Sequence, residues 1–119
     1  MNWKKAFKKG NLIVLATIDE KNKPHANIIA SLGFVDGKIL VANSQMQTTI
    51  KNLQKSKAAC LISMNDNLYI RAKGKVEIFD SGKYFEICLK ADKEYPPRHA
   101  ILIKPTEVFD LDKVKPIKQ

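Results

Sequence analysis

A polar turn between two apolar segments contains the residues best suited to hold a charged small molecule. The turn is residues 43–49, NSQMQTT, and Lys51 follows it. The largely apolar segments 38–43 and 58–63 on either side predict strands, and residues 46–55 between them predict a helix. The first N–H groups of a helix lack partners within the helix, and the helix dipole favours an anion there. The turn therefore predicts a site for a phosphorylated small molecule.

The same turn also has a purely structural interpretation. Ser44 and Gln47 are three residues apart, which is the spacing of a capping box. In a capping box the two side chains satisfy the helix's own N–H groups and leave none for a ligand. Thr48 and Thr49 are ordinary first-turn residues, so their role in binding depends on further evidence. The turn by itself leaves both interpretations open.

Length and composition predict a single folded domain over residues 1–119, with 112–119 as a frayed tail. No apolar run approaches the roughly 18–20 residues that cross a bilayer, so we expect no membrane partner. The N-terminus is basic, but the apolar stretch 12–18 is short and is followed at once by Asp19 and Glu20. This pattern is not typical of a signal peptide, and we expect a cytoplasmic protein.

The net charge of +9 raises the question of nucleic-acid binding. Of the 21 basic residues, two are arginines, Arg71 and Arg98, and the other 19 are lysines spread along the chain. Base recognition favours the planar donors of arginine, whereas lysine is a point charge. We therefore expect a lysine-rich solvated surface and no specific nucleic-acid partner.

The chain contains few residues of the kinds that ligate metals or act as nucleophiles. Cys60 and Cys88 lie among apolar neighbours and are expected to be buried free thiols. His25 and His99 are far apart in sequence and no CxxC pair is present, so no metal site is predicted. No catalytic triad or paired-carboxylate arrangement stands out, and no catalytic residue is assigned.

The hydrophobic pattern predicts a mainly β chain with peripheral helices. About six or seven strands with helices between them favour a small closed or partly closed β-barrel. The predicted helices are one at the N-terminus ending at Gly10, one at 46–55, and one from a cap at Asp80 or Ser81 to Lys90; the predicted strands are 12–18, 25–32, 34–35, 38–43, 58–63, 68–79, and the pair 100–103 and 107–111, separated by Pro105.

Short motifs accompany these elements in a fixed order. They are Pro24-His25, Asp36-Gly37, Lys51-Asn52-Leu53, Gly74-x-Val76 and the final strand 101–105 of the type Ile-Leu-Ile-x-Pro. In this order, from about residue 12 to residue 111, the chain resembles the split β-barrel family typified by pyridoxamine 5′-phosphate oxidase. The resemblance is strongest to its small FMN-binding members.

The resemblance implies a split β-barrel homodimer with FMN at the subunit interface. It further implies a small oxidoreductase or electron carrier, in which the flavin ring performs the chemistry. The cofactor contacts that it implies are Asn27, Ile28, Ile29, Ala30 and Ser31 on the second strand, then Ala42, Asn43, Met46, Gln47, Thr48, Thr49 and Lys51, with Asn52 less certain, and Arg71 on the long strand.

One departure from the family pattern bears on the cofactor. Family members often carry Arg or Lys near the start of this helix, where the chain has Thr48 and Thr49. Hydroxyl groups donate to a phosphate but supply no charge. Lys51 or a lysine of the partner is a candidate replacement. The alternative is a non-catalytic dimeric barrel that binds the deazaflavin F420, haem or no cofactor. Pyridoxamine phosphate oxidation itself is not expected, because the chain is short and lacks basic residues for a second phosphorylated ligand.

Overall fold

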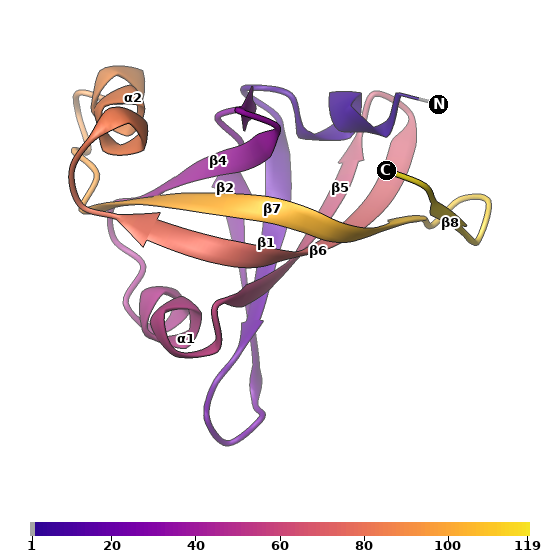
Figure 1. The fold of residues 1–119 in the computed structure, drawn as a ribbon, viewed down its shortest axis with the longest axis horizontal. Coiled ribbons are helices and arrows are strands. Elements are labelled where there is room, and N and C mark those ends of the chain that lie inside the picture. The colour runs from indigo at the N-terminus through magenta and orange to yellow at the C-terminus, as the bar shows by residue number, and fades with distance from the viewer. Residues whose placement is uncertain (1) are drawn as a thin grey trace.

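The computed structural model describes residues 2–119 and is dominated by one antiparallel sheet of eight strands (Figure 1). The strand order is β2-β1-β5-β6-β7-β4-β3, and β8 pairs with β7. The mainly β architecture predicted from sequence is confirmed. The elements are a 3-10 helix η1 (Trp3–Phe7), β1 (Leu12–Ile18), β2 (Pro24–Ala30), β3 (Phe34–Val35), β4 (Lys38–Asn43), α1 (Thr48–Ser56), β5 (Ala58–Asn65), β6 (Leu68–Phe79), α2 (Lys83–Ala91), β7 (His99–Asp110) and β8 (Lys115–Ile117).

The principal core lies inside the curved sheet, because alternate residues of the strands point inward. Leu15, Leu61 and Ile103, from three different strands, are all fully buried there. The short helix η1 packs against this core at the β5 and β6 side of the sheet, where Trp3 and Phe7 make an edge-to-face contact. The N-terminal segment therefore covers the core even though it contributes no strand.

A second apolar cluster holds α2 against the outer face of the sheet. Leu40 and Leu102 are buried there against Cys88 of α2. Helix α1 contacts β1 and β2 instead, so the two helices lie on opposite sides of the end of β7 (Figure 1). The turn that precedes α1 and the loop that follows α2 both flank the point where β4 and β7 pair.

Strand β7 is continuous from His99 to Asp110, so the predicted break at Pro105 is wrong. Proline lacks an N–H and is tolerated in a strand where the pairing is irregular. The register between β6 and β7 shifts at Lys73/Gly74, and Gly74 is the residue opposite Pro105. The predicted frayed tail is also corrected, because β8 extends the sheet by pairing with residues 108–110 of β7.

Several predicted boundaries move by a few residues. The second strand ends at Ala30 rather than at residue 32, and the fifth continues to Asn65. The N-terminal helix is a single 3-10 segment that ends at Phe7, before Gly10. Helix α2 starts after Gly82 without a side-chain cap, so the predicted cap at Asp80 or Ser81 is wrong.

Of the two thiols, Cys88 is buried and Cys60 is half-buried, and both are free. No helix within residues 2–119 is long and apolar enough to cross a membrane.

Candidate ligand-binding cleft

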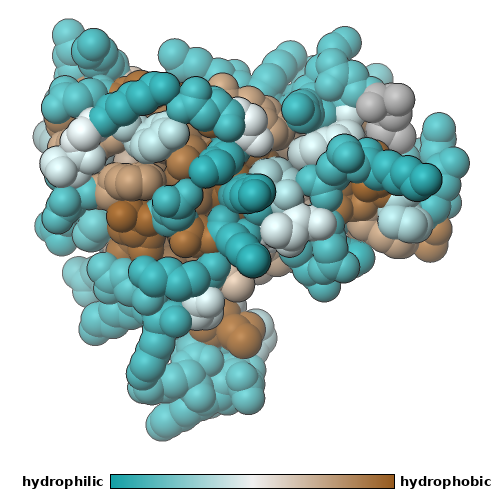
Figure 2. All heavy atoms as spheres, in the orientation of Figure 1, coloured by the Kyte–Doolittle hydropathy of each residue, from teal (hydrophilic) through white to brown (hydrophobic). Residues whose placement is uncertain are grey.

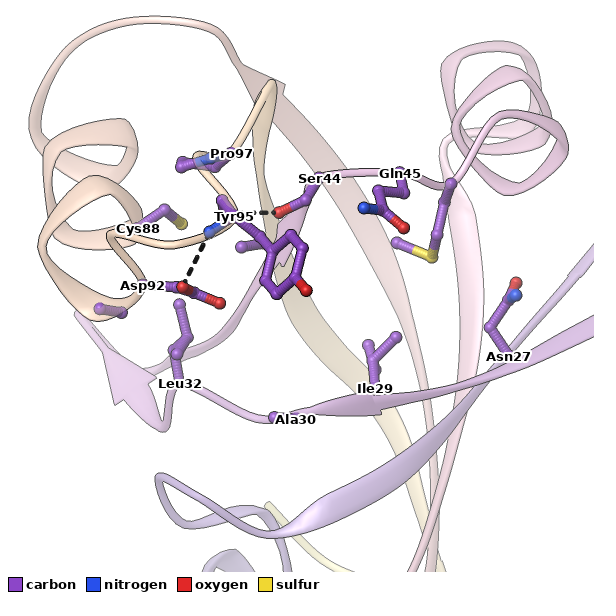
Figure 3. Close-up of a pocket in the computed structure, with 13 residues that line it drawn as sticks. Asn27, Ile29, Ala30, Leu32, Ser44, Gln45, Cys88, Asp92, Tyr95 and Pro97 are labelled. Carbon is purple, nitrogen blue, oxygen red and sulfur yellow. Dashed lines mark hydrogen bonds between the residues drawn. The ribbon is translucent and has the colours of Figure 1, made fainter.

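A cleft of about 650 Å³ opens between β2, the turn after β4 and the segment that joins α2 to β7 (Figure 3). In Figure 3, β2 runs below the cleft, the 44–46 turn above it, and the loop after α2 closes one end. Three parts of the chain that are distant in sequence thus form its walls. The lining residues are Asn27, Ile29, Ala30, Leu32, Ala42, Ser44, Gln45, Met46, Cys88, Ala91, Asp92, Tyr95 and Pro97.

The walls of the cleft are mainly apolar. Ile29, Ala42 and Met46 contribute apolar surface to the cleft. The ring of Tyr95 extends into the space between the turn at Ser44 and Ile29 of β2 (Figure 3). Tyr95 is 52% exposed, so much of its ring is available to a ligand. The space-filling view shows a separate group of apolar atoms between the positions of α2 and α1, over the ends of β6 and β7 (Figure 2). A mainly apolar cleft with an exposed aromatic side chain in its lining suits a flat heteroaromatic ring.

The loop that carries Tyr95 is held in place by three hydrogen bonds. Oδ1 of Asp92 accepts from the backbone N–H groups of Glu94 and Tyr95, each at 3.0 Å. Ser44 Oγ donates to the backbone O of Tyr95 at 3.1 Å. The Ser44 side chain therefore ties the loop to the turn after β4, and the predicted capping box of Ser44 and Gln47 is not formed.

Asn43, at the end of β4, organises the turn itself. Its side chain is buried, its Oδ1 accepts from Met46 N–H at 2.8 Å, and its Nδ2 lies 3.1 Å from Nδ1 of His99. Because Oδ1 is the acceptor for Met46, Nδ2 is the donor to His99, whose Nδ1 must then be unprotonated. Asn43 and His99 are also register partners across β4 and β7. The amide thus fixes the turn to the strand pair below it.

Helix α1 begins beside this turn with no side-chain cap. Gln47 is the N-cap residue, and its side chain makes no capping hydrogen bond. Thr49 is buried, and its Oγ1 donates to Oδ1 of Asn27 on β2. The backbone N–H groups of the first turn are therefore left for an anion, while the Thr49 hydroxyl is already engaged.

The structure brings together five of the predicted site residues: Asn27, Ile29, Ala30, Ala42 and Met46 all line the cleft. Two others are placed differently. Ile28 is 73% exposed, and, because side chains alternate along a strand, it points away from Ile29. Ser31 is buried, with Oγ donating to Phe7 O at 2.6 Å and accepting from Gly33 N–H at 3.0 Å, which is a structural role.

The residues predicted to hold a phosphate are divided between two sides of α1. Thr48 and Lys51 line a separate hollow of about 760 Å³ between α1 and the β1–β2 turn. Asn52, also in that hollow, donates to Thr17 Oγ1 at 3.0 Å. Gln47 is exposed and does not line the cleft, whereas Arg71 lies over the Phe109 ring in a third hollow. These side chains therefore form no cluster with the cleft residues.

The residues that sequence reasoning missed belong mostly to the segment 88–97. Cys88, Ala91, Asp92, Tyr95 and Pro97 all line the cleft. Their only signal in the sequence is a polar loop containing an aromatic residue and two prolines, which does not say where the loop folds. Burial raises the pKa of the Cys88 thiol to about 11, so it is a neutral part of the wall near pH 7.

Comparison with known proteins places this cleft in a family context. The model of the family described as Pyridoxamine 5'-phosphate oxidase matches residues 2–112. No curated protein matches the chain. Among solved structures, HupZ of Group A Streptococcus is similar with a TM-score of 0.81 and 21% identity, over 98% of this chain and 96% of that one.

Two further structures carry cofactor names. An F420 reductase has a TM-score of 0.74 and 17% identity, over 91% of this chain and 96% of that one. An FMN-binding protein from Syntrophomonas wolfei subsp. wolfei has a TM-score of 0.72 and 19% identity, over 97% of this chain and 81% of that one. At these identities the structural likeness shows a shared fold.

Proposed function

Because the chain belongs to the pyridoxamine 5′-phosphate oxidase family, we propose that it is a homodimeric FMN-binding flavoprotein that acts as a small oxidoreductase or electron carrier. The observation that carries this proposal is the apolar cleft beside the uncapped start of α1. The fold neighbours named as an FMN-binding protein and an F420 reductase support a flavin-type ligand.

The residues of the cleft fit the ring of a flavin. Ile29, Ala42 and Met46 would provide apolar contacts to the ring, and the aromatic ring of Tyr95 would contact it from the loop after α2. When bound, the flavin supplies hydride and electron transfer. The protein residues position the ring and exclude water from its faces. The backbone N–H groups in the first turn of α1 have no side-chain cap, so they are available to donate hydrogen bonds to a phosphate on the ribityl chain.

A homodimer is supported by an exposed apolar face on the other side of β2. Val14 lies opposite Ile28 on one side and opposite Ile62 on the other, so three apolar residues form a row across β2, β1 and β5. Ile28 is 73% exposed, and Met64 on the same face of β5 is 72% exposed, opposite Tyr69. Apolar surface of this kind marks a protein interface. Since β2 also forms the floor of the cleft, a second copy on this face would lie next to the ligand.

The oligomeric state tests this face. Ile28→Glu places a charge in the centre of the proposed interface, and we expect sedimentation to show a shift from dimer to monomer. Val114→Glu is the matched control, because Val114 is equally exposed at 73% but lies in the turn between β7 and β8. A wild-type monomer, or an Ile28→Glu dimer, contradicts the proposed interface.

The cofactor is tested by the visible absorption of the purified protein, before and after addition of excess FMN and desalting. We expect about one flavin to be retained per protomer in the folded dimer. Tyr95→Ala should raise the Kd for FMN about threefold to tenfold, since an aromatic contact contributes roughly 0.5–1.5 kcal/mol. Lys93→Ala, on the same loop but outside the cleft, is the control. A protein that binds F420 but not FMN, or neither, overturns the assignment of FMN.

A further inference from the structure

The cleft offers little positive charge to a phosphate. Its 13 lining residues include no lysine or arginine from residues 2–119, and the single charged side chain among them is the carboxylate of Asp92. This is unusual for a chain with net charge +9. The lysines and arginines of residues 2–119 all lie outside this lining.

The polar groups best placed to hold a phosphate are engaged with one another. Thr49 Oγ1 donates to Asn27 Oδ1, which joins the start of α1 to β2 where the cleft meets the helix. The amide of Asn43 is divided between Met46 N–H and His99 Nδ1. Lys51 faces the hollow on the other side of α1. Within one protomer, what remains for a phosphate is the partial charge of the first-turn N–H groups.

Asp92 adds a negative charge to the wall. Only its Oδ1 is used in the hydrogen bonds to Glu94 and Tyr95, and in Figure 3 the other carboxylate oxygen points toward the interior of the cleft. That oxygen accepts from N–H or O–H donors on a ligand and repels a phosphate dianion. The carboxylate therefore offsets the attraction that the helix dipole provides.

We propose that the cleft recognises the flavin ring and not the phosphate, so that the chain binds unphosphorylated flavin about as tightly as FMN. This inference rests on the proposed flavin-binding function and names the chemical class of its ligand: a flat, uncharged heteroaromatic molecule with hydrogen-bond donors. In this cleft Asp92 is the residue whose charge offsets the attraction of the α1 start for a phosphate.

The test compares riboflavin and FMN on the intact wild-type protein by quenching of flavin fluorescence at low and moderate salt. We expect the two Kd values to differ by less than tenfold, with little dependence on salt. A preference for FMN above tenfold overturns the inference but leaves the proposed function standing. If the folded protein binds neither flavin, the proposed function fails, and the inference fails with it.

Two substitutions sharpen the comparison. Asp92→Asn keeps an oxygen that accepts from Glu94 and Tyr95 but removes the charge, so the ratio of the riboflavin Kd to the FMN Kd should rise about threefold or more. Asn27→Arg introduces a cation beside α1 and should raise the same ratio further. Asp80→Asn, an exposed aspartate outside the cleft, is the charge-matched control and should leave the ratio unchanged. An unchanged ratio in Asp92→Asn would show that the charge of Asp92 does not oppose binding of the phosphate.

Discussion

Thr49, in the first turn of α1, donates a hydrogen bond to Asn27 on the edge strand β2, across 22 residues of sequence. A second bond, from Asn52 Nδ2 to Thr17 Oγ1 at 3.0 Å, joins the next turn of α1 to β1. Helix α1 is therefore attached to the β1–β2 hairpin by two polar contacts, in addition to the packing of Ile50 and Leu53. This attachment sets the position of the helix start relative to the cleft.

We predict that Thr49→Val lowers the free energy of unfolding by about 1–2 kcal/mol, because it leaves the Asn27 amide without its donor. Urea denaturation measures this change. Thr48→Val, one residue earlier and exposed, should stay within about 0.5 kcal/mol of wild type. Adding Asn27→Ala to Thr49→Val should cost less than the sum of the two single changes, since the partners act as a pair. Strict additivity would show that the bond does not form in solution.

Gly74 on β6 lies where the backbone of β7 leaves no room for a side chain. A Cβ at this position would be 2.4 Å from Lys104 O and 2.9 Å from Ile103 Cγ2. The carbonyl belongs to a strand paired on both sides and cannot move without disturbing the sheet. We predict that Gly74→Ala destabilises the protein by about 2 kcal/mol or more, as measured by thermal or urea unfolding. Lys75→Ala, exposed and adjacent, is the control. A fully stable Gly74→Ala protein would mean that the two strands are further apart than described.

Asp36 connects the turn between β3 and β4 to the start of α2. It accepts from Lys83 Nζ and from Tyr84 OH, each at 2.8 Å, and these two bonds, that of Lys83 first, hold the pKa of its carboxyl below the ordinary value. Because the folded-state pKa is the lower one, the contribution to stability is present above about pH 4 and is lost as the pH falls through the folded-state pKa.

We therefore predict that Asp36→Asn makes the urea midpoint less sensitive to pH below about 4, while lowering it slightly at pH 7. Urea unfolding at pH 7, 4 and 3 compares the two proteins. Asp80→Asn is the control, because Asp80 makes no ion pair within residues 2–119. This variant should retain the acid sensitivity of the wild type. Parallel pH profiles for Asp36→Asn and wild type would contradict this role.

Cys88 should behave as an unreactive thiol in the native protein. Burial raises its pKa to about 11, against about 8.5 for a free thiol, so little thiolate is present at pH 8. We predict slow labelling of Cys88 by iodoacetamide at pH 8, compared with faster labelling of the half-buried Cys60, measured by peptide mass spectrometry. Denaturant should equalise the two rates. By linkage, the neutral thiol contributes full stability below about pH 8.5, and this is lost as the pH rises toward 11. Equal rates in the native state would contradict the burial of Cys88.

Local pattern was sufficient for much of the sheet. Strands β1, β4 and β6 have the bounds that the sequence predicts. Their signals are local: valine, isoleucine and threonine in β1, the Asp36-Gly37 turn before the apolar β4, and the alternation of apolar and polar residues in β6. The pattern failed where a distant partner decides the outcome. Pro105 remains inside β7 because Gly74 on β6 accommodates the irregular pairing, and β8 forms because β7 extends far enough to pair with it.

Some residues of the candidate site could also be predicted from the sequence, and others could not. The 43–49 turn and the family resemblance were enough to predict that residues of β2 and of the β4 end lie together, and Asn27, Ile29, Ala30, Ala42 and Met46 do line one cleft, because the order of these elements is readable from sequence. Neither the engagement of Thr49 with Asn27 nor the approach of Asp92 and Tyr95 to β2 could be read in that way. The loop after α2 reaches the turn because β4 pairs with β7 over residues 39–43 and 99–103, whereas the Thr49–Asn27 bond depends on the packing of α1 against β1 and β2. The sequence by itself determined the family and two walls of the cleft. Only the tertiary structure decided the third wall and the charge of the cleft, because both depend on contacts between segments far apart in the chain.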